Sequence, residues 1–330
     1  MEHDTKKAVL VENRRSFLKK TALMAAAAAF PALPSCIPIN TIKANVPLKS
    51  TEIKTAAVLW YSQTGNTQKC GKVLAKTFEK NGITVVYGDL RDVDKSTIFN
   101  VDLMVIGSPV FYYDTPNFVK DFIRSLPDLD GIPVAAYVTF GGPEGNQHNA
   151  ACSILKGMVQ KNGVPVGLES FMSISTYSLS FKENDTGIKT IQNTILPDHE
   201  TYKKIREYAG FIKSQVEKGN ASEYKQTLTL REFSTYFKPE WWTKLTVNNH
   251  YIIEQKCLGC GVCVEKCPTN SIDLDSFSVN TETCVLCFGC INNCRYQAVN
   301  MEYQNKKLIG FQTYLDKNNL KFELPHELKT

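Results

Sequence analysis

Residues 55–67 read TAAVLWYSQTGNT, and this stretch decides the fold of the larger part of the chain. Its first part, Thr55–Tyr61, is a short apolar run of the kind found in buried β-strands. The next six residues, Ser62–Thr67, bring hydroxyls, amides and a glycine to the point where a helix is expected to begin. A turn of this kind aims backbone N–H groups at a phosphate without needing a lysine. The alternative is an ordinary strand-to-helix turn in which Thr64 caps the helix.

Short apolar runs and helical stretches alternate from Ile53 to about Gly219. Four more strands are expected at Ile83–Tyr87, Leu103–Ile106, Pro133–Thr139 and Val166–Met172. Helices are expected at Thr67–Asn81, Pro116–Leu126, Ala150–Asn162 and His199–Lys218. Strand–helix alternation indicates βαβ units with right-handed crossovers. The sequence therefore predicts an α/β domain over residues 53–219, with a doubly wound parallel sheet of five strands.

Two further loops follow predicted strands at the same edge of the sheet. The first contains three consecutive aromatic residues and comprises Ser108, Pro109, Val110, Phe111, Tyr112 and Tyr113. The second is rich in glycine and comprises Thr139, Phe140, Gly141, Gly142 and Gly145. Open α/β sheets bind ligands outside the carboxyl ends of their strands, so aromatics there suit stacking on a planar ring. We therefore predict that the three loops form one cofactor site.

The phosphate loop resembles the S/T-x-T-G-N-T loop of flavodoxins, in the residues Ser62, Gln63, Thr64, Gly65, Asn66 and Thr67. With the other two loops, the resemblance covers residues 53–219 and implies FMN as the cofactor. FMN is expected rather than FAD, because one phosphate loop and no G-x-G-x-x-G pattern are present. The chain departs from most flavodoxins in that this region is not strongly acidic. Which of the three aromatics stacks on the flavin is left open.

Eight cysteines near the C-terminus fall into two runs with the same spacing. The runs are Cys257-x2-Cys260-x2-Cys263-x3-Cys267 and Cys284-x2-Cys287-x2-Cys290-x3-Cys294. Thiolates bind [4Fe–4S] clusters four at a time, and in two-cluster ferredoxins the fourth cysteine of each run ligates the other cluster. The expected ligand sets are therefore Cys257, Cys260, Cys263 and Cys294, and Cys284, Cys287, Cys290 and Cys267. Zinc sites with paired C-x2-C motifs need four cysteines rather than eight.

Residues 251–304 resemble the bacterial two-[4Fe–4S] ferredoxins, and this resemblance implies a small α+β domain. The chain departs from the pattern at Arg295, where the first run has Pro268. Two other cysteines, Cys70 and Cys152, are spaced with apolar residues along predicted helices and are interpreted as core thiols.

The first 35 residues are interpreted as an export signal. Asn13–Lys19 reads NRRSFLK and resembles the twin-arginine motif. The apolar stretch that follows, Thr21–Phe30, is shorter than the roughly 20 residues needed to span a bilayer. Cys36 ends a sequence that resembles a lipoprotein cleavage box, which predicts that Cys36 is acylated. The alternatives are that an ordinary signal peptidase cleaves the signal, or that the signal stays uncleaved as a tether. The predicted location is the periplasm or the outer face of the membrane.

The remaining segments are a tether (36–52), a connector (220–250) and a C-terminal tail (305–330). Apolar residues make up 43% of the chain and charged residues 22%, a composition typical of folded proteins. The net charge is +5, with no clustered basic pattern of the kind that nucleic-acid binding requires. Nucleic acid is therefore not expected as a partner.

The whole chain resembles bacterial flavodoxin–ferredoxin fusion proteins, which implies electron transfer between the clusters and FMN. Clusters exchange single electrons and a flavin holds one or two, so the predicted function is a one-to-two electron adaptor. One alternative is an FMN-dependent reductase of an unknown substrate, supplied by its own clusters. Another is an interaction module whose flavodoxin fold is empty. The expected partner is a redox protein or a small-molecule electron donor or acceptor, and catalytic residues are not assigned.

Overall fold

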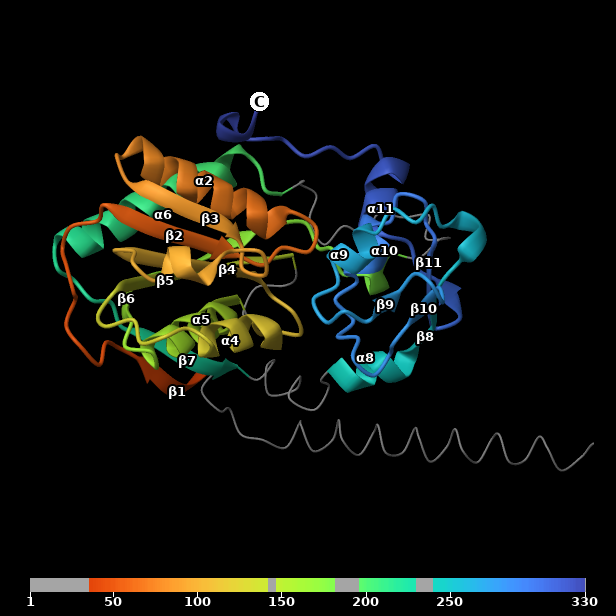
Figure 1. Ribbon diagram of the computed structural model, residues 1–330, viewed down its shortest axis with the longest axis horizontal. Helices are drawn as coiled ribbons and strands as arrows, with labels where there is room; N and C mark the ends of the chain where they lie inside the picture. The colour runs from red at the N-terminus through yellow and green to blue at the C-terminus, as the bar shows by residue number, and fades with distance from the viewer. Residues whose placement is uncertain (1–35, 142–146, 182–195, 230–239, 330) are drawn as a thin grey trace, which may run out of the picture.

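The computed structural model describes residues 36–141, 147–181, 196–229 and 240–329. Two lobes lie side by side (Figure 1): a sheet domain built from residues 53–219 and a cysteine domain built from residues 247–309. The twin-arginine residues Arg14 and Arg15, together with Gly142 and Gly145, lie outside the described residues.

The sheet domain contains the predicted five parallel strands in the order β3-β2-β4-β5-β6. Their bounds are β2 (Thr55–Trp60), β3 (Thr84–Asp89), β4 (Leu103–Pro109), β5 (Pro133–Phe140) and β6 (Val164–Met172). Neighbouring strands are parallel throughout, with Val58 opposite both Tyr87 and Val105. The order reverses beside β2, which places a crevice at the carboxyl ends of β2 and β4. The predicted fold is confirmed.

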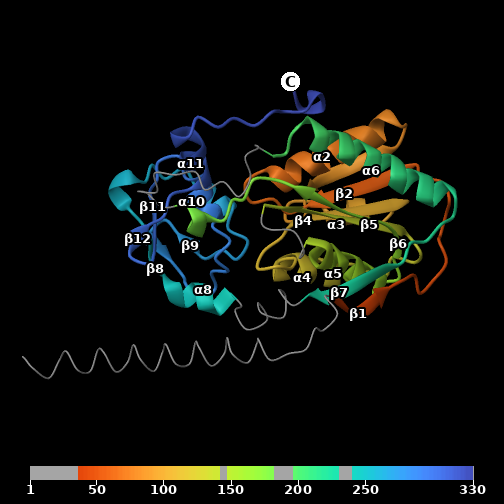
Figure 2. The same ribbon diagram turned by 180° about the vertical axis from the view of Figure 1, so that it is seen from behind.

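Helices cover both faces of the sheet (Figures 1 and 2). On one face lie α2 (Asn66–Lys80) and α6 (His199–Glu217), and on the other lie α4 (Asn117–Arg124) and α5 (Gln147–Val159). A short helix, α3 (Lys95–Ile98), follows β3. Helix α2 forms where Val73, Leu74 and Phe78 recur at helical spacing, and all three are fully buried against the sheet. This packing fixes the N-terminus of α2 at the sheet edge.

The segments predicted as tether and connector contain regular structure. Strand β1 (Cys36–Ile42) pairs antiparallel with β7 (Tyr224–Thr229), forming a separate two-stranded sheet beside α5. Ile42 is buried in the core cluster of that face of the domain. The strands were missed because β1 contains a proline and β7 is mostly polar, so neither has the pattern expected of a strand. Helix α8 (Glu240–Thr246) then leads into the cysteine domain.

The cysteine domain has a three-stranded sheet of β12 (Lys306–Lys307), β11 (Val299–Tyr303) and β8 (Val247–Ile252). A small hairpin of β9 (Ile272–Asp273) and β10 (Ser278–Val279) lies beside it. Each cysteine run contains one short helix, α9 (Val262–Glu265) or α10 (Gly289–Asn293). The two cysteine runs therefore repeat in structure as they do in sequence.

The C-terminal tail contacts both domains. Helix α11 (Phe311–Lys317) packs near α10, and the ring of Tyr314 stacks on Phe181 at 4.3 Å between centroids. The chain then crosses back over the sheet domain (Figure 1) to the short helix η3 (His326–Leu328), which lies against α2. No helix among the described residues is long and apolar enough to cross a membrane.

Candidate functional site

The predicted phosphate loop is a strand-to-helix turn, and no side chain caps the helix that it leads into. Gly65 is the N-cap of α2 and has φ = 93°, a left-handed conformation that favours glycine. Because Gly65 has no side chain, the N–H groups of the first helical turn are not used by a cap. Its own N–H donates to Ser62 Oγ at 3.1 Å, which holds the turn in shape. The loop therefore has the geometry of an anion site at a helix N-terminus.

Two buried side-chain atoms of this loop make no hydrogen bond within the described residues. They are Nε2 of Gln63 and Oδ1 of Asn66, and both residues are about 95% buried. Buried polar atoms are normally paired, because leaving one unpaired costs about 1–3 kcal/mol. Both residues also line the cavity described next, so a polar ligand that carries donors and acceptors, as a ribityl phosphate does, fits this pair of residues.

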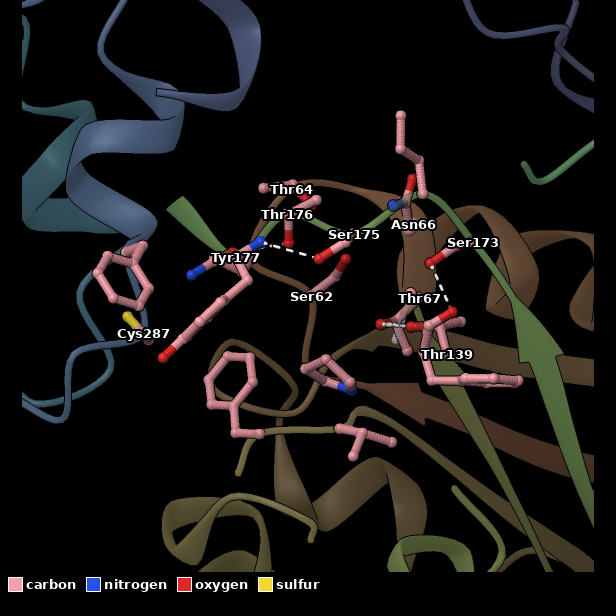
Figure 3. Close-up of a pocket in the computed structure, with 18 of the residues that line it drawn as sticks. Ser62, Thr64, Asn66, Thr67, Thr139, Ser173, Ser175, Thr176, Tyr177 and Cys287 are labelled. Carbon is pink, nitrogen blue, oxygen red and sulfur yellow. Dashed lines mark hydrogen bonds between the residues drawn. The ribbon is translucent and has the colours of Figure 1, made fainter. Parts of the chain in front are cut away.

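The loop forms one wall of a cavity of about 320 Å³ at the carboxyl edge of the sheet (Figure 3). All the described members of the predicted site line it except Gly65 and Ser108. Ser108 is fully buried, and its hydroxyl donates to the Pro109 carbonyl. Thr67 Oγ1 lies 2.7 Å from Thr139 Oγ1, so the phosphate loop and the glycine loop are bonded to each other. The volume falls within the range of ligand pockets.

The three aromatics occupy different environments along the cavity. Phe111 is half-buried and meets the ring of Tyr61 edge-on at 6.3 Å. Tyr112 and Tyr113 have φ values of 47° and 72°, which bulky residues rarely adopt. The Tyr112 hydroxyl donates to the carbonyl of Leu286 in the cysteine domain at 3.3 Å. Strained backbone of this kind is held by its surroundings, here a contact between the domains.

A fourth loop, which follows β6, was not predicted. Ser173, Ile174, Ser175, Thr176 and Tyr177 line the cavity, and Gln147 at the start of α5 does so as well. The Ser173 N–H donates to the Phe140 carbonyl at 2.7 Å, which joins this loop to the glycine loop. The run of serine and threonine residues after the fifth predicted strand could have indicated this loop as part of the site.

The cysteine domain also lines the same cavity, with Leu286, Cys287 and Phe288. Figure 3 shows Cys287 across the cavity from Ser62, Thr64 and Asn66. One of the predicted cluster ligands therefore lines the cavity formed by the predicted flavin loops.

Two adjacent asparagines bind the cysteine domain to the phosphate loop. Asn293 Nδ2 donates to the Gln63 carbonyl at 3.0 Å, and Asn292 Nδ2 lies 3.3 Å from Gln63 Oε1. Asn292 is 97% buried and also donates to the Thr176 carbonyl at 2.9 Å. Its Oδ1 accepts from Ser178 Oγ at 2.8 Å and from the Phe311 N–H at 2.9 Å. Asn292 therefore joins the cavity loops, the cysteine domain and the tail.

The eight predicted ligands separate into two groups of four, each around its own small cavity. The proximal site, next to the flavin-type cavity, is lined by Cys267, Cys284, Cys287 and Cys290. The distal site is lined by Cys257, Cys260, Cys263 and Cys294. In each group the fourth member comes from the other run, which is the crossed grouping expected for two clusters. No three acidic, histidine or cysteine side chains among the described residues converge closely enough for a single metal ion.

Backbone N–H groups surround the sulfur atoms in both sites. Hydrogen bonds run from Ser271 to Cys267 Sγ at 3.2 Å, from Ala298 to Cys294 Sγ at 3.3 Å and from Gly289 to Cys287 Sγ at 3.4 Å. The two sites differ in burial, since burial raises the pKa of Cys287 to about 12 while Cys260 is exposed. Donors of this kind suit ligand sulfurs that carry negative charge.

Comparisons with known proteins agree with this division of the chain. Residues 57–181 match the family described as Flavodoxin domain, and residues 250–273 match the family described as 4Fe-4S binding domain. No curated protein matches the chain.

Solved flavodoxins are among the structures similar to this chain. A flavodoxin from the domain Archaea is 16% identical with a TM-score of 0.37, and it covers 49% of this chain and 99% of its own. Oxidised flavodoxin 2 from Bacillus cereus is 17% identical with a TM-score of 0.38, covering 49% of this chain and 99% of its own. Rubredoxin oxygen:oxidoreductase from Desulfovibrio gigas is 18% identical with a TM-score of 0.36, and the match covers 50% of this chain and 37% of that protein.

The chain therefore joins a flavodoxin-like domain to a 4Fe–4S ferredoxin domain near its C-terminus. The first domain implies FMN and the second implies a [4Fe–4S] cluster, and the cavities described above fit both groups. A chain with these two domains is an electron-transfer flavo-iron–sulfur protein.

Proposed function

We propose that this protein passes electrons between two [4Fe–4S] clusters and FMN within a single molecule. The observation that carries the proposal is the position of Cys287. It belongs to the proximal site and also lines the cavity that contains the phosphate loop. A cluster at the proximal site and a flavin in the cavity would be neighbours separated by few protein atoms.

The residues that line the cavity have separate proposed roles. The first turn of α2 binds the phosphate, while Gln63 and Asn66 supply the buried donor and acceptor. Tyr112, Tyr177 and Phe288 enclose the side of the cavity toward the proximal site, with Tyr177 edge-on to Phe288 at 5.4 Å. FMN supplies chemistry of one or two electrons when bound, and the clusters supply one-electron steps.

The distal site is the proposed point of exchange with an outside partner. Cys260 is exposed, and the side chain of Leu258 beside it is 69% exposed. The proximal Cys290 is buried, and Cys287 faces the cavity. Electrons would therefore pass between an external redox protein or small molecule and the distal site, then the proximal site, then FMN. The direction of net electron flow depends on the reduction potentials of the clusters, the flavin and the external partner.

A reductase is the second candidate function, because the cavity is open to solvent on one side. Tyr113 and Tyr177, which both line it, are 39% and 40% exposed. A small substrate could approach a flavin there. An empty interaction module is disfavoured by Gln63 Nε2 and Asn66 Oδ1, which would stay buried and unpaired without a ligand.

We also propose that the protein is exported already folded, by the twin-arginine route. The support is the NRRSFLK motif together with cofactors that are inserted into folded proteins. Cys36 is the proposed lipid anchor on the outer face of the membrane. Its backbone begins β1, which packs beside the sheet domain and would keep that domain close to the anchor.

The test of the proposed electron path is kinetic. The clusters of the holoprotein are reduced rapidly under anaerobic conditions, and flavin absorbance is followed at several protein concentrations. Transfer within one molecule predicts a rate constant that does not change with concentration. A rate constant that rises in proportion to concentration would contradict the proposal and favour exchange between molecules. Consumption of a screened substrate at a rate matching flavin reoxidation would favour the reductase.

A further inference from the structure

The two cysteine runs differ from each other at positions that line the flavin-type cavity. The runs align without gaps, as CLGCGVC at residues 257–263 and CVLCFGC at residues 284–290. Where the first run has Gly259 and Gly261, the second has Leu286 and Phe288. Leu286 and Phe288 line the cavity, and none of the described residues that line it comes from the first run. The repeat is therefore broken where the second run meets the cavity.

Both of these bulky residues have a backbone conformation that suits glycine. Gly259 and Gly261 have φ values of 66° and 73°. The residues that replace them keep the same left-handed conformation, with φ values of 46° for Leu286 and 62° for Phe288. Such a conformation is uncommon for large side chains and persists only where the surroundings enforce it. Backbone strain of this kind is a reason to look for a function in the side chains that cause it.

The surroundings that hold Leu286 and Phe288 belong to the sheet domain as well as to the ferredoxin domain. Both residues are buried in the core of the ferredoxin domain. The Phe288 ring also meets the ring of Tyr177, in the loop after β6, edge-on at 5.4 Å between centroids. The carbonyl of Leu286 accepts the hydrogen bond of the Tyr112 hydroxyl at 3.3 Å. Each residue therefore contacts a cavity loop of the other domain.

The next residue, Gly289, shows the opposite exchange. Its counterpart in the first run is Val262. A Cβ atom on Gly289 would lie 3.4 Å from Cγ of Gln63 in the phosphate loop and 3.3 Å from the Lys266 carbonyl. The methyl groups of a valine would need still more of this space, so the phosphate loop could not approach as closely. Bulk is thus present where the second run lines the cavity and absent where it meets the phosphate loop.

Phe288 lines the proximal cluster site as well as the flavin-type cavity. The segment that carries it contains Cys284, Cys287 and Cys290, which are three of the four proximal ligands. Metal binding is coupled to folding where the ligands come from a segment that the metal fixes. The position of the Phe288 backbone therefore depends on what the cysteines on either side of it bind.

We propose that Leu286 and Phe288 are flavin-binding residues, so that FMN is bound by both domains and its affinity depends on the cluster at the proximal site. The inference rests on the proposed function, which places FMN in the cavity and a cluster at the proximal site. An aliphatic and an aromatic side chain suit the ring system of a flavin. Cys287, between them, lies across the cavity from Thr64 and Asn66 of the phosphate loop (Figure 3).

The proposal has a reciprocal consequence. If the proximal cluster raises the affinity for FMN, then FMN must stabilise the proximal cluster by the same factor, because a coupling free energy belongs to both sites. The distal site should not share this coupling, since none of its four cysteines lines the flavin-type cavity.

The first experiment measures the dissociation constant of FMN, by quenching of flavin fluorescence, for full-length protein that carries its clusters but has been freed of FMN. Phe288→Gly restores the residue type of the first run and relieves the left-handed strain. It should nevertheless weaken FMN binding about tenfold, which corresponds to about 1.4 kcal/mol. The matched control is Phe277→Gly. Phe277 lies in the same domain with φ = 50° and is not among the residues that line either the cavity or the proximal site.

A second variant covers the case in which Phe288→Gly does not retain its clusters. Phe288→Leu keeps an apolar side chain in the core of the ferredoxin domain and removes only the aromatic ring. With both cluster signals intact, it should weaken FMN binding several-fold relative to wild type. Wild-type affinity in a cluster-loaded variant at position 288, or an equal loss in Phe277→Gly, would overturn the inference.

The second experiment tests the coupling in the wild-type protein. Cluster-loaded protein is exposed to an iron chelator with and without FMN, and samples are reduced at intervals to record the EPR signals of the two clusters. FMN should slow the loss of the proximal signal about tenfold and leave the distal signal unaffected, and Phe288→Gly should abolish this protection. Protection of neither cluster, or equal protection of both, would overturn the coupling. A wild-type protein that binds no FMN would instead contradict the proposed function itself.

Discussion

Arg206 in α6 donates hydrogen bonds of 2.7 and 3.0 Å to the two carboxylate oxygens of Glu327 in the C-terminal tail. The Glu327 side chain is only 2% exposed and also lies 3.7 Å from Lys80 Nζ. Tyr202 donates to the Glu323 carbonyl of the same tail at 3.1 Å. The chain that leaves the ferredoxin domain is thus bonded to the flavodoxin-like domain at a second place, far from the cavity.

The first prediction concerns this ion pair. Glu327→Gln should release the end of the tail and increase its proteolytic cleavage at pH 7 by roughly 10- to 100-fold, since a hydrogen bond to a charged group contributes about 1.5–3 kcal/mol. Glu323→Gln, which changes an exposed carboxylate of the same tail, is the matched control. Limited proteolysis followed by mass spectrometry measures the effect. Equal cleavage of both variants would contradict the role assigned to Glu327.

The same pair has a defined pH dependence. The pKa of Glu327 lies at about 2, chiefly because Arg206 donates hydrogen bonds to its carboxylate. An unfolded glutamate titrates near 4.3, so the stabilisation is complete above that value and is lost as pH falls through about 2. Between pH 5 and 8 the part of the protection that depends on the ionisation of Glu327 should stay constant. A loss of protection within that range would show that another group controls the contact.

The third prediction concerns flavin binding. Thr64→Ala and Asn66→Ala should weaken FMN binding by roughly one to two decades, because each removes a polar group from the phosphate loop. Titration of the apoprotein by quenching of FMN fluorescence measures this. Asn81→Ala at the opposite end of α2 is the control, since its side chain bonds only to the Thr77 carbonyl among the contacts described. Unchanged affinity in Asn66→Ala would remove that residue from the site.

The fourth prediction concerns the contact between the domains. Asn292→Ala leaves the hydrogen-bonding groups of Ser178, Thr176 and Phe311 without their partner, so the flavin reduction rate within the molecule should fall and the melting temperature should drop. Asn300→Ala is the control, because Asn300 is equally buried but donates within the ferredoxin domain, to the Asn249 carbonyl. A rate unchanged in Asn292→Ala but reduced in Asn300→Ala would contradict the proposed electron path.

The fifth prediction concerns cluster content and export. A fully loaded chain should hold eight iron and eight sulfide ions, four of each at the proximal and four at the distal site. Cys260→Ser should disturb the distal EPR signal first, and Cys287→Ser the proximal one. Zinc without iron would contradict the assignment.

Export can be tested with two further sets of substitutions in the full chain. Replacing both Arg14 and Arg15 with Lys should leave cofactor-containing precursor inside the cell, while Cys36→Ser should release exported protein from membranes. Normal export of the double variant would count against the twin-arginine route.

Much of the fold could be predicted from local pattern. The central strands β2, β4 and β5 are buried on both faces and stand out as short apolar runs. The helices between the strands keep a clear apolar face. Strands β1 and β7 were missed because they are stabilised by each other, at a sequence separation that no local pattern reveals. The short helix α3 is held by Asp94 at its N-cap, a signal too common to select it.

The site could be predicted only where loops leave recognised strands. Ser62–Thr67 and the aromatic loop were found in this way, and the structure places them around one cavity. The wall formed by Leu286–Phe288 was not found, because it depends on how two domains pack. Asn292 was missed for the same reason, since it acquires its role from a neighbour in the other domain.

The bond between Asn292 and the phosphate loop also has a consequence for how such chains diverge over time. If recombination replaced the ferredoxin domain with that of a distant relative, Gln63 would lose its asparagine partners. Buried amide groups would then be left without hydrogen bonds. The two domains therefore cannot be exchanged independently of each other. Substitutions at positions 63 and 292 should be inherited together, as a pair of matched changes across more than two hundred intervening residues.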